Sequence, residues 1–270
     1  MTLVEFWLFV AVGCLTGFLA GLFGIGGGLL MIPILIFSYE HSGVSPSVLT
    51  HIAFGTSLFV VIFSSLSSAY QHRKQRNIDW RSVFVIGFSS ALTALATTRL
   101  AAVLSGRYLR AAFALVVITA AVRMLTESKI RAQEKLEFSS KPSNPGLIGV
   151  GLSVGILSGL GGIGGGIFSI PMMYHFLNMP LRLAIGTSSA TVVITALFSV
   201  AGYVLNGMGR ADLPEWSFGF VDLSRGVALA LGSLLTARTG ASVSLRIHPY
   251  RLRRLFASFM ILVSVYMLVK

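Results

Sequence analysis

The chain has 270 residues, of which 54% are hydrophobic and only 11% are charged, whereas soluble domains carry about 25% charged residues. This composition excludes an ordinary soluble protein and predicts a polytopic membrane protein. The formal net charge of +12 would suggest a nucleic-acid binder in a soluble chain. Here the basic residues lie mostly between apolar runs, where cations orient membrane segments and meet anionic lipids. The single cysteine, Cys14, excludes a disulfide framework and a cysteine metal cluster.

The first apolar run leads into the glycine core Gly24-Ile25-Gly26-Gly27-Gly28. Glu5 is its only early charge, so we expect no cleaved signal peptide. Each glycine costs a helix about 1 kcal/mol relative to alanine, and irregular backbone at membrane depth is tolerated only inside protein or along a cavity. The following stretch, Leu29–Phe37, would extend about 13 Å as a helix, too short for a hydrocarbon core of about 30 Å. We therefore predict a break between two half-helices, either a re-entrant hairpin or an unwound span.

Runs of about membrane-spanning length, uncharged except for Arg99 and Arg238, predict three transmembrane helices in each half of the chain. They are Thr50–Tyr70, Val83–Leu104, Ala111–Val122, Ala184–Leu205, Val227–Leu245 and Leu255–Val269. We assign residues 1–126 to a first transmembrane repeat, residues 127–145 to a polar cytoplasmic linker, and residues 146–270 to a second transmembrane repeat.

The two halves are copies of each other. The glycine core and its Ile-Pro recur after 138 residues as Gly162–Gly166 and Ile170-Pro171, and the Gly-Thr-Ser of Ala53–Ser57 recurs after 131 residues in Ala184–Ser188. Asp79 matches Asp222 at an offset of 143. Internal repeats are typical of secondary transporters, whose substrate binds between the repeats near the midplane.

Glycines spaced every fourth residue precede both glycine cores. Small residues at this spacing line one helix face and allow another helix to approach closely. We therefore expect a helix-packing role for Gly13, Gly17, Gly21, Gly151, Gly155 and Gly159.

The loop charges favour the hairpin. With each glycine segment folded as a re-entrant hairpin, the lysines and arginines outside the spans divide 14 to 5 between the two sides. This bias is stronger than the one obtained when each glycine segment is counted as a full span, and so it agrees better with the positive-inside rule. Three full spans per repeat is an odd number, so the repeats would be inverted. The predicted fold is an all-α polytopic membrane protein of two homologous, inverted repeats, each with a glycine-broken helix and three transmembrane helices.

A helix that begins after a glycine run presents unpaired N–H groups and the positive end of its dipole, which together form an anion site without side-chain charge. Hydroxyl groups in the neighbouring spans could donate further bonds, or could bond their own helix backbone. The candidate substrate-binding residues are Gly24, Gly26, Gly27, Gly28, Thr56, Ser57, Gly162, Gly164, Gly165, Gly166, Thr187 and Ser188.

Ionisable residues are scarce in the predicted spans. No Asp or Glu lies inside one, which argues against cation transport and carboxylate-based hydrolysis. Proton coupling would therefore fall to His51 or His175, although a lone histidine near a helix end is more often an interfacial hydrogen bonder. Arg99 and Arg238 could attract an anion or snorkel to the interface. We expect no catalytic group, metal site or cofactor, since no dinucleotide fingerprint or P-loop is present.

The paired glycine cores followed by Ile-Pro, the Gly-Thr-Ser segments and the Leu-Arg…Phe-Ala last spans resemble the TauE/SafE sulfite exporter family over the whole chain. The resemblance implies a bacterial or archaeal inner-membrane exporter, proton-linked, for sulfite or organosulfonates such as sulfoacetate, isethionate and taurine-related compounds. The expected partners are the small anion, the lipid bilayer, protons as the candidate coupling ion, and a second copy of the chain in a homodimer, but no nucleic acid. The family's motif residues correspond here to the candidate glycines and hydroxyls together with Pro33 and Pro171.

The leading hypothesis is therefore a secondary transporter rather than an enzyme. An anion channel or a uniporter driven by the membrane potential is the alternative, because an interior-negative potential by itself drives anions outward. A membrane-embedded enzyme ranks third, since the sequence offers no nucleophile, base or metal cluster for it.

Overall fold

The computed structural model describes residues 2–126 and 142–247 together with scattered positions between 250 and 265. Most of the predicted last span, Leu255–Val269, and most of the predicted linker at 127–145 lie outside the described residues.

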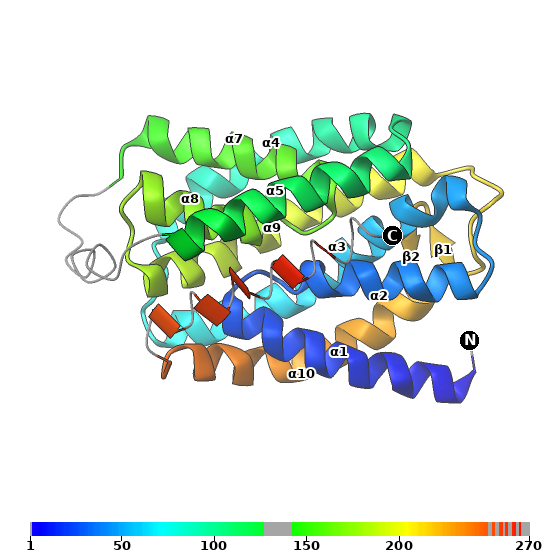
Figure 1. Ribbon diagram of the computed structural model, residues 1–270, viewed down its shortest axis with the longest axis horizontal. Coiled ribbons are helices and arrows are strands. Elements are labelled where there is room, and N and C mark those ends of the chain that lie inside the picture. The colour runs from blue at the N-terminus through cyan, green and yellow to red at the C-terminus, as the bar shows by residue number, and fades with distance from the viewer. Residues whose placement is uncertain are drawn as a thin grey trace.

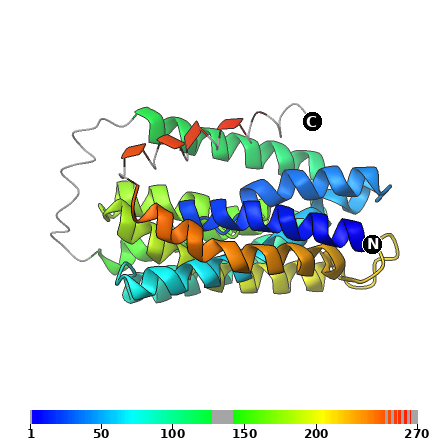
Figure 2. The ribbon, with the colours of Figure 1, turned by 90° about the horizontal axis from the view of Figure 1, so that it is seen from below.

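The described residues form helices packed side by side along the longest axis of the molecule (Figure 1, Figure 2). They are α1 (Leu3–Phe23), α2 (Gly28–His41), α3 (Pro46–Lys74), α4 (Trp80–Val103), α5 (Gly106–Thr126), α7 (Asn144–Gly161), α8 (Gly166–Phe176), α9 (Leu181–Gly207) and α10 (Leu223–Ser244). Strands β1 (Ser217–Phe218) and β2 (Val221–Asp222) pair antiparallel between α9 and α10. Six of the described helices are long and apolar enough to cross a membrane. This confirms the predicted all-α polytopic membrane fold.

The helices are longer than the uncharged runs that predicted them. α3 extends four residues beyond Thr50–Tyr70 at each end, from Pro46 at its N-terminus to Lys74 in its last turn. Proline suits the first turn of a helix and basic residues suit the last. The helix therefore continues through polar and charged residues at both ends, and the length of the uncharged run underestimates the length of the helix. α2, with 14 residues, is likewise longer than the predicted Leu29–Phe37.

Both glycine cores reverse the chain. The N-terminus and the end of α2 lie at the same end of the molecule (Figure 1). In the other half, a Cβ atom added at Gly146, at the start of α7, would lie 3.0 Å from Leu177, directly after α8. α1 has 21 residues, about 31 Å of helix, so the hairpin joins one long helix to one shorter helix rather than two half-helices.

The glycines spaced every fourth residue mediate helix packing, as predicted. A Cβ atom added at Gly17 would overlap the backbone of Ser233 in α10, and one added at Gly155 would overlap the backbone of Ser90 in α4. The first helix of each half thus packs closely on the fourth helix of the other half.

α3 and α9 form the centre of the molecule and are the most buried of the six long helices. The end of the molecule that holds the N-terminus and strands β1 and β2 is called the hairpin-strand end below. The opposite end is called the basic end, because it holds the basic end of α3, Arg73 and Lys74.

Candidate anion site at the glycine turns

Each glycine core forms a turn whose backbone conformation favours glycine. The φ angles are +71° at Gly24, +76° at Gly26 and +84° at Gly27, and the second core repeats them with +67° at Gly162, +75° at Gly164 and +81° at Gly165. Side chains are disfavoured in this left-handed region because Cβ crowds the backbone. The duplicated glycines therefore give the two halves turns of the same backbone conformation.

The two turns meet in the centre of the molecule. A Cβ atom added at Gly28 would lie 2.9 Å from the Cα atom of Ile163, and one added at Gly166 would lie 2.7 Å from the Cα atom of Ile25. All these residues are buried. The starts of α2 and α8 thus come together across the boundary between the two halves.

The turns leave backbone donors free. The N–H groups of Gly24 and Gly162 donate to Ala20 and Ser158. Those of Gly26, Gly27, Gly28, Gly164, Gly165 and Gly166 have no protein acceptor among the described residues, and neither helix start has a side-chain cap. Free N–H groups at two helix starts form an anion-binding arrangement that needs no cationic side chain.

Serine hydroxyls surround the turns. Ser188 donates to the carbonyl of Gly24 at 3.2 Å and lies 2.6 Å from the hydroxyl of Ser169. Ser57 donates weakly to Gly28 at 3.5 Å. Ser65 is fully buried, has no described hydrogen-bond partner and lies where it would meet a Cβ atom added at Gly26. Ser65 is a candidate site residue that the sequence analysis missed, because its counterpart at the offset of 131 is Ala196 and the repeat gave no signal there.

The two predicted threonines have other partners. Thr56 accepts a hydrogen bond from the N–H of Asp222 at 2.9 Å, and Thr187 accepts one from the N–H of Asp79 at 3.0 Å. Each bond joins the central helix of one half to the start of α10 or α4 in the other half. These hydroxyls therefore tie the two halves together, away from the glycine turns.

The predicted histidines lie apart from the turns. His51 is buried, forms a 3.0 Å hydrogen bond with the carbonyl of Ala101 and stacks on Phe220. His175 is half-buried in the last turn of α8 and contacts the ring of Tyr174 edge-on. His72, which the sequence analysis passed over, is fully buried, and neither ring nitrogen has a described hydrogen-bond partner.

The intramembrane arginines point outward. Arg99 and Arg238 are both exposed, and Arg238 lies 4.5 Å from the centre of the Tyr70 ring. This placement suits snorkelling better than contact with a buried anion. Within the described residues no group of three His, Cys, Asp or Glu side chains could hold a metal ion.

The structure has a buried carboxylate, Asp222, that the sequence did not reveal because it lies just before a predicted span rather than inside one. Asp222 caps α10, accepting from the N–H groups of Ser224 and Arg225, and its side chain is fully buried. It pairs with Arg225 at 2.9 Å and accepts a hydrogen bond from Tyr39. Its match with Asp79 and its position directly before an apolar run were signals in the sequence.

Comparison with known proteins identifies the family. The family described as "Sulfite exporter TauE/SafE" matches residues 9–267. The chain belongs to this family. It is 31% identical over 269 residues to a "Probable membrane transporter protein" of Haemophilus influenzae, covering 97% of this chain and 98% of that protein. It is 30% identical over 262 residues to a probable membrane transporter protein of Methanocaldococcus jannaschii, covering 97% and 94%. No solved structure matches this chain.

Proposed function

We propose that this multi-pass membrane protein of the TauE/SafE family is a secondary transporter, not an enzyme. Its substrates are small sulfur-containing anions such as sulfite and organosulfonates, exported across the inner membrane of a bacterium or archaeon. The observation that carries the proposal is the meeting of two glycine turns whose free N–H groups lie beside Ser57 and Ser188.

The electrostatics of this site favour an oxyanion. Each helix start is equivalent to about half a positive charge, and two of them converge where the surroundings are buried and screening by water is weak. Sulfite and sulfonate groups offer three oxygen acceptors, and the free N–H groups of the two turns and the unpartnered hydroxyl of Ser65 could donate to them at once. The site residues include no carboxylate that would compete for these donors.

Access to the site requires helix motion. Cβ atoms added at Gly26 and Gly164 would each meet the side chain of Val61, at 2.6 and 2.8 Å, and Val192 lies close to both positions. Both valines are fully buried. We infer that one hairpin moves relative to α3 and α9 to open the site to one side, and that the other hairpin opens it to the other side, as in rocking of two repeats about a fixed site.

The driving force follows from the charge of the cargo. One elementary charge crossing 100 mV gains about 2.3 kcal/mol, so an interior-negative potential alone drives export of an anion. Proton linkage would add a second driving force and would need a titrating side chain, for which His51 and His175 are the predicted candidates and His72 is a third.

Counterflow in proteoliposomes tests the proposal. Vesicles loaded with sulfite should take up labelled sulfite faster than unloaded vesicles, because exchange by a carrier is accelerated by substrate on the far side. Equal rates would indicate a channel or a uniporter limited by another step. Absence of flux for sulfite, 2-hydroxyethanesulfonate and sulfoacetate, in protein that remains monodisperse, would contradict the proposed substrate class.

A further inference from the structure

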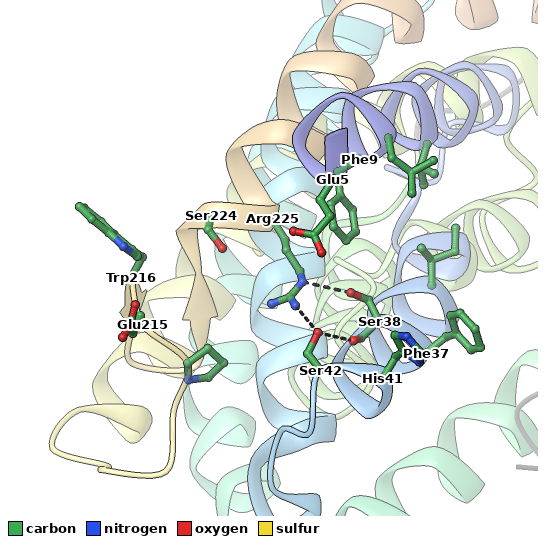
Figure 3. Close-up of a pocket in the computed structure, with 14 residues that line it drawn as sticks. Glu5, Phe9, Phe37, Ser38, His41, Ser42, Glu215, Trp216, Ser224 and Arg225 are labelled. Atoms are coloured by element: carbon green, nitrogen blue, oxygen red, sulfur yellow. Dashed lines mark hydrogen bonds between the residues drawn. The ribbon is translucent and has the colours of Figure 1, made fainter. Parts of the chain in front are cut away.

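A second candidate binding site lies at the hairpin-strand end, separate from the glycine turns. A pocket of about 570 Å³ opens there between α1, α2, the start of α10 and the segment before β1 (Figure 3). None of the glycine-turn residues lines it. Its walls combine apolar side chains, such as Phe9 and Phe37, with serine hydroxyls and charged groups.

Arg225 is fixed on one wall of the pocket. Its Nε atom donates to Ser38 at 3.0 Å, and its two terminal nitrogens donate to Asp222 at 2.9 Å and Ser42 at 2.7 Å. The ring of Tyr39 lies 4.7 Å from the guanidinium carbon, and only 15% of the side chain is exposed. A guanidinium carries five N–H donors, so two of those of Arg225 have no described acceptor, on a group that three hydrogen bonds hold in place.

The charges around the pocket exclude a simple anion as the best ligand. Asp222 already neutralises Arg225, and the lining adds the carboxylates of Glu5 and Glu215, with His41 as its remaining titratable group. The pocket is therefore acidic overall at neutral pH. A ligand that uses the free donors of Arg225 must also bring a positive charge.

Another part of the lining can accept that positive charge. Glu215 and Trp216 line the pocket from the segment before β1 (Figure 3). Trp216 is 80% exposed, so its indole is available to a cation, and ammonium groups bind well over the face of tryptophan. The adjacent carboxylate of Glu215 adds a direct counter-charge.

The pocket is not a by-product of the duplication. At the offset of 143, the counterpart of Arg225 is Ser82, which donates to Asp79. At the offset of 138, the counterpart of Tyr39 is Leu177. The capping aspartate is thus shared by both repeats, whereas the arginine and the tyrosine beside it belong to the hairpin-strand end alone.

We propose that this pocket binds a zwitterion in which a primary ammonium group lies a few bonds from a tetrahedral oxyanion. The oxyanion occupies the free donors of Arg225 beside Ser42, and the ammonium group lies against Glu215 and Trp216. Free aminosulfonates and the head group of phosphatidylethanolamine share this chemistry. The exposed apolar side chains of Leu8 and Phe37 at the pocket place it where a lipid head group could also reach it.

Matched ligands test the free zwitterion. In the double variant Ser57→Ala with Ser188→Ala, whose glycine turns should bind sulfonates weakly, and in nanodiscs of phosphatidylglycerol, which has no amine, we expect 2-aminoethanesulfonate to bind at least tenfold more tightly than 2-hydroxyethanesulfonate, which has the same length and no ammonium group. Glu215→Gln should remove most of this preference. Glu40→Gln, which changes an exposed carboxylate of α2 outside the pocket lining, should retain it.

Lipid composition tests the second source. If the head group is the occupant, phosphatidylethanolamine nanodiscs should raise the unfolding temperature above that in phosphatidylglycerol, Glu215→Gln should abolish the difference, and the soluble aminosulfonate should bind only in phosphatidylglycerol. Equal binding of the two sulfonates together with no lipid-dependent shift, or full preference in Glu215→Gln, would overturn the proposal. Binding is measured without transport, and Ser57→Ala with Ser188→Ala should leave the preference for 2-aminoethanesulfonate intact. A negative result for this pocket can therefore be distinguished from a negative result for the transport site.

Discussion

Adjacent residues of the Gly-Thr-Ser segment have different partners. Thr56 accepts from the N–H of Asp222, and Ser57 faces Gly28. Thr56→Val would leave a buried N–H without its acceptor, which costs about 1–3 kcal/mol, so we expect a clearly lower unfolding temperature in detergent. Thr191→Val is the control, because Thr191 is equally buried and donates only to the carbonyl of Thr187 in its own helix. Equal loss of stability in both variants would contradict the tie between the halves.

His72 offers a test of buried polarity. Its ring lies fully buried without a described hydrogen-bond partner, next to the close approach of Gly186 to the backbone of Asn77. If the ring serves packing alone, His72→Phe should unfold at the same or a higher temperature and transport normally, because an apolar ring has no polar atoms to leave unsatisfied. If His72 carries the coupling proton, the variant should stay folded while the pH dependence of flux disappears. Lower stability with unchanged transport and an unchanged pH profile would contradict both readings.

At the scale of single residues, the sequence predicted the glycines better than the hydroxyls. Three consecutive glycines exclude a helix in lipid for local reasons, and the turns at Gly24–Gly27 and Gly162–Gly165 followed from that. The partners of Thr56 and Thr187 lie in the other half of the chain, and no local pattern encodes such a distance. Ser65 has no counterpart in the second repeat, so an argument from duplication could not find it.

α1 and α10 pack closely because the glycines of α1 have no side chain to separate the two backbones. An alanine Cβ at Gly17 would overlap the backbone of Ser233 in α10, whereas at Gly149 nothing lies within 4 Å. Overpacking typically costs about 1–3 kcal/mol, so Gly17→Ala should lower the unfolding temperature. Gly149→Ala, the same substitution at an exposed helix position, should be neutral or should stabilise by up to about 1 kcal/mol. A Gly17→Ala variant as stable as the wild type would contradict the close packing of α1 on α10.

The existence of most helices was predictable, but their lengths were not. Uncharged runs located the helices because lipid-facing backbone must bond internally. They could not show that α1 extends for 21 residues before its glycine turn, nor that two short strands would follow α9. Buried Asp222 was not predicted because it is the N-cap of α10 and lies just before the apolar run, whereas only charges inside the runs were counted.

The whole molecule has a charge asymmetry that predicts its orientation. From the positive-inside rule we expect the basic end in the cytoplasm and the hairpin-strand end outside. In a Cys14→Ala background, a membrane-impermeant maleimide added to intact cells should label Ala211→Cys and should label Gln75→Cys only after permeabilisation. Both positions are exposed. The reverse pattern would overturn the orientation, and labelling of both in intact cells would overturn the placement of these two loops on opposite sides.

We propose that the meeting point of the two glycine turns binds the transported anion. The most direct measurement is sulfite counterflow by the double variant Ser57→Ala with Ser188→Ala, compared with Ser90→Ala, which removes an equally buried hydroxyl that bonds to Thr195 away from the turns. With both proteins folded and monodisperse, we expect the double variant to lose at least tenfold in rate at low sulfite, equivalent to about 1.4 kcal/mol, while Ser90→Ala stays within about twofold of the wild type. Equal rates in the double variant and the wild type would contradict the claim.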